Sequence, residues 1–175
     1  MCAAQSVRKS VPMADIGADH AYLPIFLIKT GACPFAYAVD VSEGSCKKAA
    51  ANIVRAGLTE QIQVIRGDGL SVFSEREKPE DFVFAGMGGR KMISILEKTA
   101  WIKNPRYRLI LSPNTSIDEL RQWLCQNRFT VLAEHSVSAK GRLYTIMTAA
   151  FKCENEFSHD KIGLSTNFAL QAKDG

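Results

Sequence analysis

A turn between two apolar segments near the N-terminus constrains the fold more than any other feature of this chain. The run Met13-Ala-Asp-Ile-Gly17 has the composition of a short buried strand, and Ile25-Phe-Leu-Ile28 is compatible with a helix. A strand that turns sharply through glycine over a helix N-terminus opens many ligand-binding α/β sheets. The sequence therefore predicts an α/β fold with a ligand site at the end of this first strand.

The same alternation continues along the chain. Runs of apolar or β-branched residues end at the following positions: Asp15, Asp40, near Asp68, Met87 and Pro113. Helix-compatible segments lie between them, over residues 42–56, 89–98 and from 116 onward. Strands and helices that alternate at this spacing form βαβ units, so we expect a parallel sheet.

Helix-end signals support two of these segments. Ser42 is of the residue type that caps a helix N-terminus, and Gly57 directly follows the last expected helical residue. The spacing of Ser116 and Glu119 is that of a capping box, in which each side chain satisfies a backbone N–H near the other residue. We therefore expect helix N-termini at Ser42 and Ser116.

The last strands differ from the earlier ones. Phe129–Leu132 and Leu143–Met147 flank the run Ser138-Ala-Lys-Gly-Arg142, which predicts two strands joined by a glycine turn. A terminal antiparallel hairpin on an otherwise parallel sheet is typical of the Rossmann-like class I methyltransferase fold. We expect one such domain over residues 1–153, followed by a tail or marginal helix over 154–175.

Composition excludes several classes of protein. The 175 residues are 46% hydrophobic, enough for one domain with a core, and no run approaches the roughly 18 apolar residues of a membrane span. The N-terminus lacks the apolar run of a signal peptide, so we expect a cytoplasmic protein. The five scattered cysteines and three histidines predict neither a disulfide framework nor a metal site. We also expect a monomer.

The charge balance permits a nucleic-acid partner without requiring one. Lys and Arg number 22 against 18 Asp and Glu, which gives a net charge of +4. Basic pairs recur, among them Arg90 with Lys91 and Lys140 with Arg142. Each pair alone is better explained by a solvated surface.

The loop after the first strand carries the residues that define its ligand. Asp15 would repel a pyrophosphate, but its carboxylate suits a cationic ligand such as S-adenosylmethionine. Gly17 allows the turn, and Asp19 and His20 stand where many such loops carry another glycine. Their side chains would face the reactive end of the ligand. The competing interpretation is that Asp19 caps the helix that starts near Ala21.

Acidic residues also end the second and third strands. Asp40 stands where an acidic residue accepts hydrogen bonds from the ribose hydroxyls of an adenosine ligand, and the alternative is a turn or cap residue. Glu43 either shares this contact or favours the following helix through its dipole. Asp68 can accept a hydrogen bond from an adenine amine, and Gly69 would let the backbone approach the ring. The alternative for this pair is an ordinary Asp-Gly turn.

Three glycines in the four residues that end at Gly89 follow the fourth strand. They predict a bend or a close approach of a ligand to the backbone. This loop lies at the edge where a substrate would meet the methyl donor, and we assign Met87 to the cofactor. Asn114, after the fifth strand, either reaches into the same cleft or forms a plain turn. Tyr22 either stacks on a substrate base or simply packs at the helix start.

One known family carries the same motifs. The sequence resembles the bacterial tRNA (adenine-22-N1)-methyltransferases in these runs: Asp15-Ile-Gly-Ala-Asp-His-Ala-Tyr-Leu-Pro24, Gly67-Asp-Gly69, Ala85-Gly-Met-Gly-Gly89 and Pro113-Asn114. The resemblance covers roughly residues 11–150 and implies S-adenosylmethionine as cofactor and tRNA as partner. It also implies that cofactor contacts come from Asp15, Gly17, Asp40 and Asp68, catalysis from Asp19, and base contacts from Gly88, Gly89 and Asn114.

The activity that the resemblance implies is methyl transfer to N1 of adenine 22 in tRNA. The N1 lone pair needs positioning above all, and a carboxylate such as Asp19 would stabilise the positive charge that moves onto the ring. Family members have a helix before the first strand and a C-terminal helical domain, and we expect both ends to be short here. Two alternatives therefore stay open: a shortened homologue that binds S-adenosylmethionine without turning over tRNA, and a small-molecule methyltransferase. The absence of Gly-x-Gly-x-x-Gly argues against a nicotinamide oxidoreductase.

Overall fold

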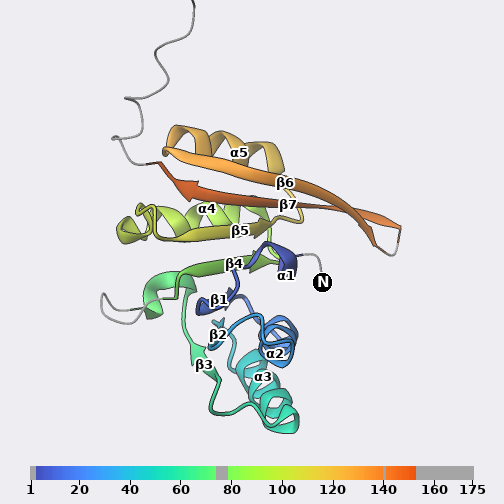
Figure 1. Cartoon of the computed structure of the whole chain (residues 1–175). Helices are drawn as coiled ribbons and strands as arrows, with labels where there is room; N and C mark the ends of the chain where they lie inside the picture. The colour runs from blue at the N-terminus through green and yellow to red at the C-terminus, as the bar shows by residue number, and fades with distance from the viewer. Residues whose placement is uncertain (1–2, 74–78, 140, 153–175) are drawn as a thin grey trace, which may run out of the picture.

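The chain folds as a single sheet with helices on both faces (Figure 1). The computed structural model describes residues 3–73, 79–139 and 141–152. Within these residues the sheet has seven strands in the order β3-β2-β1-β4-β5-β7-β6. Strands β1 to β5 pair in parallel, whereas β7 is antiparallel to both β5 and β6. The predicted Rossmann-like methyltransferase fold with a terminal antiparallel hairpin is confirmed.

The elements follow one another in this order: α1 (Ala3–Ser6), β1 (Met13–Ile16), α2 (Tyr22–Lys29), β2 (Ala36–Asp40), α3 (Glu43–Ala56), β3 (Ile62–Arg66), the 3₁₀ helix η1 (Gly69–Val72), β4 (Asp81–Ala85), α4 (Gly89–Glu97), the 3₁₀ helix η2 (Ala100–Ile102), β5 (Arg108–Ser112), α5 (Ile117–Gln126), β6 (Phe129–Ala139) and β7 (Arg142–Phe151). The strand runs and the three long helical segments predicted from the sequence are all present, each within a few residues of its expected bounds.

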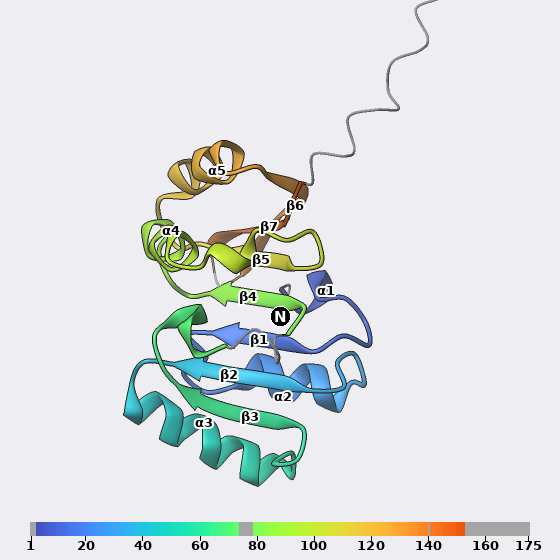
Figure 2. The ribbon, with the colours of Figure 1, turned by 90° about the vertical axis from the view of Figure 1, so that its left-hand side faces the viewer.

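Two apolar cores lie on opposite faces of the sheet. On one face, Met92 of α4 and Leu124 of α5 pack in a cluster that includes Ile16 of β1. On the other, Leu27 of α2 and Ile53 of α3 belong to a second cluster with strand residues such as Ile110. Figure 2 shows α4 and α5 on the sheet's upper half and α2 and α3 beside its lower half. Successive strand residues point to opposite faces, so a residue next to Ile16 in sequence faces α2 and α3.

Both helices start where predicted, but only one has the expected side-chain cap. Ser42 caps α3 by accepting a hydrogen bond from the N–H of Ser45, and Gly57 ends the helix in the left-handed conformation at φ 72°. Ser116 precedes α5 but lies at φ 56° and makes no side-chain capping bond. The capping box predicted there is wrong, because Glu119 instead accepts two hydrogen bonds from Arg90, with the nearer Nε at 2.5 Å.

The terminal hairpin is longer than the sequence indicates. Its strands pair from Phe129 with Phe151 to Ala139 with Arg142, across a β-bulge between Val131 and Ala133. The glycine turn is confirmed, since Gly141 has φ 72°. Figure 1 shows the hairpin extending past the ends of the neighbouring strands. The predicted tail lies outside the described residues.

A buried ion pair holds the segment before β1 at the opposite end of the sheet from the strand C-termini. Asp81, the first residue of β4, has no exposed surface. It accepts hydrogen bonds from the backbone N–H of Arg8 at 2.6 Å and from its Nε at 2.7 Å. Nothing in the sequence pattern indicated this pair. In the part of the chain that the structure describes, no helix is long and apolar enough to cross a membrane.

Candidate active site at the carboxyl edge of the sheet

The loop after β1 passes over the end of β2. The backbone N–H groups of Gly17 and Ala18 both donate to the carbonyl of Val39, at 2.8 and 3.0 Å. Gly17 has φ 87°, a conformation that glycine adopts readily and other residues rarely do. The arrowheads of β1, β2 and β4 point to the same side in Figure 2, so the predicted site residues that follow these strands gather at one edge.

The loops after β1, β4 and β5 contact one another. A Cβ added to Gly17 would lie 2.9 Å from Cε of Met87, so the methionine side chain packs directly on the β1 loop. The backbone N–H of Asn114 donates to the carbonyl of Met87 at 3.0 Å. Met87 therefore links the predicted cofactor loop to the predicted substrate residue Asn114.

Asp15 and Asp40 form an acidic pair at the ends of β1 and β2, in which Asp15 is buried and Asp40 half-buried. By the alternation along each strand, both face α2 and α3 rather than the α4 side. Asp15 is only 8% exposed. Burial, and secondarily the nearby charge of Asp40, raise the pKa of Asp15 to about 7. Asp40 is half-buried, and its Oδ1 accepts a hydrogen bond from the N–H of Ser42 at 2.8 Å.

Asp19 has the opposite environment. Its side chain is 52% exposed, and its Oδ2 lies 3.2 Å from Nε2 of His20 while Oδ1 lies 3.6 Å from Nζ of Lys48. A hydrogen bond from Ser45 chiefly, together with the charges of His20 and Lys48, lowers the pKa of Asp19. The carboxylate therefore stays ionised at neutral pH. Helix capping by Asp19 is wrong, because α2 begins at Tyr22 and has no side-chain cap.

His20 and Tyr22 form an aromatic pair beside Asp19. Their rings are nearly parallel, 6° apart in orientation, with centroids separated by 5.1 Å. Tyr22 is 65% exposed, which is unusual for an aromatic side chain that simply packs at a helix start. The structure therefore brings Asp19, His20 and Tyr22 together on one exposed loop.

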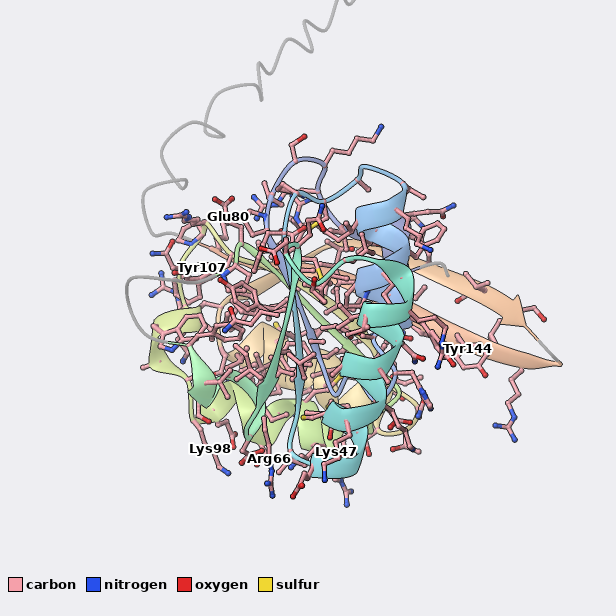
Figure 3. The ribbon with its side chains drawn as sticks, turned by 90° about the horizontal axis from the view of Figure 1, so that it is seen from below. Lys47, Arg66, Glu80, Lys98, Tyr107 and Tyr144 are labelled. Carbon is pink, nitrogen blue, oxygen red and sulfur yellow. The ribbon has the colours of Figure 1, made fainter. Side chains whose placement is uncertain are left out.

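Asp68 lies on the rim of the same edge, and lysines surround it. Its carboxylate oxygens lie 3.7 Å from Nζ of Lys91 and 3.8 Å from Nζ of Lys98. In Figure 3, Lys98 lies along one rim with Lys47 and Arg66, away from Glu80 and Tyr107. Asp68 is half-exposed, so an incoming ligand can reach its carboxylate.

The glycines near this edge have packing reasons of their own. Gly69 is at φ 63°, and a Cβ there would lie 2.6 Å from Cγ2 of Ile95 in α4. A Cβ on Gly88 would lie 2.7 Å from Oγ1 of Thr115, and one on Gly89 would lie 2.4 Å from the carbonyl oxygen of Ser116. At Gly88 and Gly89, it is therefore the protein's own loop before α5 that lies close to the glycine backbone.

Sequence reasoning missed the residues that support the β1 loop from α3. Ser45 and Lys48 contact Asp19, and Asn52 donates from Nδ2 to the carbonyl of His20 at 3.0 Å. Their spacing of three and four residues on a predicted helix was the available signal. Within the described ranges, no group of three His, Cys, Asp or Glu side chains is arranged to hold a metal ion.

The fold, with its site at the carboxyl edge of the sheet, is shared with proteins of known class. Residues 1–147 match the methyltransferase domain family. A Streptococcus pneumoniae protein solved in complex with S-adenosyl-L-methionine has 37% sequence identity and a TM-score of 0.81, over 87% of this chain and 72% of that one. M. capricolum TrmK, solved with S-adenosyl-homocysteine, has 28% identity and a TM-score of 0.76, over 85% and 66% of the two chains. The protein is a class I methyltransferase domain.

The particular family follows from a curated relative. The tRNA (adenine(22)-N(1))-methyltransferase of Bacillus subtilis is 33% identical over 170 residues, which make up 95% of this chain and 71% of the relative. The chain belongs to this family, as its motifs indicate.

Proposed function

We propose that this protein transfers a methyl group from S-adenosylmethionine to N1 of an adenine in tRNA, at position 22 by its family. The observation that carries the proposal is the set of carboxylates at one sheet edge: Asp15, Asp19, Asp40 and Asp68. They lie at or just after the C-terminal ends of β1, β2 and β3, in a fold shared with a relative of that activity. Ligands of open α/β sheets bind at this edge.

The residues present fit the cofactor. When bound, S-adenosylmethionine supplies an electrophilic methyl group on a sulfonium centre. The pair of Asp15 and Asp40 suits a ligand that combines cationic groups with ribose hydroxyls, because both would interact with carboxylates. The full set that would hold it is Asp15, Gly17, His20, Asp40, Asp68, Gly69 and Met87.

Asp19 meets the electrostatic need of the reaction. The adenine ring gains positive charge as its N1 is methylated, and an ionised carboxylate beside N1 or the N6 amine stabilises that charge. Because the pKa of Asp19 is lowered, the carboxylate is ready in its charged form at neutral pH. Asp19 then accepts the proton that N6 releases.

The base-binding side would be formed by Tyr22, Gly88, Gly89 and Asn114. The N1 edge of adenine normally faces a pairing partner, so the base must leave its stack to be methylated. The exposed ring of Tyr22, already parallel to that of His20, offers a surface on which a displaced base can stack. Gly88 and Gly89 would contribute backbone to this side, and they also pack against Thr115 and Ser116.

The proposal is tested by incubating the protein with unmodified bulk tRNA and S-adenosylmethionine labelled with tritium on the methyl group. The tRNA is then digested to nucleosides and separated. We expect the label in 1-methyladenosine. A folded protein that binds S-adenosylmethionine but labels no tRNA would instead support a cofactor-binding homologue without turnover. Label in another nucleoside would contradict the assignment to N1 of adenine.

A further inference from the structure

Three polar side chains on α3 contact the loop that carries Asp19 and His20. Ser45, Lys48 and Asn52 are separated by three and four residues, so they lie along one face of the helix. The first two contact the Asp19 carboxylate, and Asn52 donates to the His20 carbonyl. One helix face thus holds two consecutive residues of the loop.

The orientation of the Asn52 amide is fixed from its other side. Arg55 donates from Nη1 to Oδ1 of Asn52 at 3.2 Å, which leaves Nδ2 as the group that faces the His20 carbonyl. An amide has a distinct donor and acceptor end, so this contact selects one of its two orientations. The contact to the loop is therefore directional.

The loop needs such external support. Ala21, which follows His20, lies in the left-handed region at φ 55° and ψ 26°, where an alanine is strained. A residue keeps such a conformation only when its surroundings impose it. Ala21 is 1% exposed, and the α3 contacts hold the residues just before it.

We propose that Ser45, Lys48 and Asn52 are positioning residues that hold Asp19 and His20 in the geometry required for methyl transfer. The inference rests on the proposed function for its catalytic part. A small displacement of a group that acts in the transition state is costly, so loosening this loop lowers the rate of transfer more than it weakens cofactor binding.

Lys48 has a rival role. It is 57% exposed and is a cation near a site proposed for tRNA, so it is also able to bind a phosphate directly. Lys47 is the matched control, because it is the next residue on the same helix, is 75% exposed, and pairs with Glu43 rather than with the loop.

Hydrogen exchange tests the loop contacts without any reaction. Within the loop, the N–H groups of Asp19 and Ala21 donate to the carbonyls of Gly17 and Ala18. We expect Asn52→Ala to speed their exchange about fivefold, the factor for a net hydrogen bond of roughly 1 kcal/mol. Lys48→Met should speed it less and Lys47→Met not at all. Unchanged exchange in both Asn52→Ala and Lys48→Met would overturn the inference.

Single-turnover methylation then tests the catalytic part. We expect Asn52→Ala to slow transfer about fivefold at saturating tRNA with cofactor affinity nearly unchanged, and Lys48→Arg to restore most of the rate lost in Lys48→Met. In an Asp19→Asn background the effect of Lys48→Met should vanish, because the two residues act as one unit. A Lys48 effect that persists in that background would assign Lys48 to tRNA binding and overturn its positioning role.

The two proposals fail in different ways. If the wild-type protein methylates no tRNA but exchange still rises in Asn52→Ala, the proposed function fails while the contact between α3 and the loop stands. If the wild-type protein is active and Asn52→Ala leaves both exchange and rate unchanged, the proposed function stands and the positioning role of α3 is refuted.

Discussion

The carboxyl edge of the sheet has two halves of different character. At the C-terminal ends of β1, β2 and β3 the chain presents Asp19, Asp40 and Asp68, which are at least partly accessible and contact lysines or backbone N–H groups. After β4 and β5 it presents glycines and Asn114, with Gly89 and Ser116 in backbone contact. The acidic half therefore has charge that a ligand can engage, and the neutral half is shaped by the protein's own packing.

The largest effect on the rate of methyl transfer should come from substitution of Asp19. Asp19→Asn removes the charge that would stabilise the methylated ring but keeps the side-chain volume. We expect the single-turnover rate at saturating tRNA to fall on the order of a hundredfold, with cofactor affinity little changed. A rate within about threefold of wild type would remove the catalytic role of Asp19.

In the neutral half, a substitution should lower the stability of the fold by disturbing its packing. Gly89→Ala places a Cβ 2.4 Å from the carbonyl oxygen of Ser116, so the loop before α5 must shift. We expect the free energy of unfolding to fall by about 1–3 kcal/mol, as for other overpacked positions. Urea denaturation measures this. A variant as stable as wild type would show that the glycine is there for a ligand, not for the loop.

The affinity of the acidic half for the cofactor should depend on pH. A cationic ligand favours the carboxylate form of Asp15, whose pKa is raised to about 7. Cofactor affinity should therefore rise by up to about tenfold per unit as pH approaches 7 and level off above it. Calorimetry across pH should show this component in wild type and lose it in Asp15→Asn. An identical pH dependence in the two proteins would separate Asp15 from the cofactor.

The ionisation of Asp15 should affect the stability of the fold in the opposite direction, so that stability falls as pH rises. Because the folded-state pKa of Asp15 is raised above its ordinary value of 3.8, its stabilising contribution is complete below about pH 4 and is lost as pH rises through about 7. The free energy of unfolding of wild type should therefore decline over this window relative to that of Asp15→Asn. This difference checks the burial of Asp15 without any ligand.

The smallest effect is expected at a glycine on the acidic side. Gly44, in the first turn of α3, has only Ser42 Oγ within van der Waals range of an added Cβ, at 3.6 Å. Gly44→Ala should raise the free energy of unfolding by about 0.5 kcal/mol, because alanine loses less backbone entropy in a helix. Destabilisation in urea denaturation would show that the glycines in the two halves serve similar needs.

Sequence alone predicted the acidic half better than the neutral one. Asp15, Asp40 and Asp68 lie at or just after strand ends, and strand ends meet at one edge of a parallel sheet, so spacing was sufficient to bring them together. The reason for Gly89 was not predictable, because its neighbour Ser116 is 27 positions away and the contact depends on tertiary packing.

Side-chain partners set the other limits of prediction. Glu119 has capping-box spacing, but its pairing with Arg90 of α4 overrides that local pattern. Likewise, a sequence shows that Asp19 follows a strand but not that Lys48 of α3 lies within 4 Å of it. Helical spacing can place Lys48 on one face of α3, but the partner of a long-range ion pair depends on tertiary packing.

Calorimetric titration with S-adenosylmethionine tests most directly whether the cofactor binds the acidic half of the edge rather than the neutral half. The wild-type chain should bind, Asp40→Ala should bind about tenfold more weakly or worse through lost hydrogen bonds to a charged acceptor, and Asn114→Ala should bind about as well as wild type. A folded wild-type chain that binds no S-adenosylmethionine, or an Asp40→Ala variant that binds unchanged while Asn114→Ala loses affinity, would contradict the assignment of the cofactor to the acidic half.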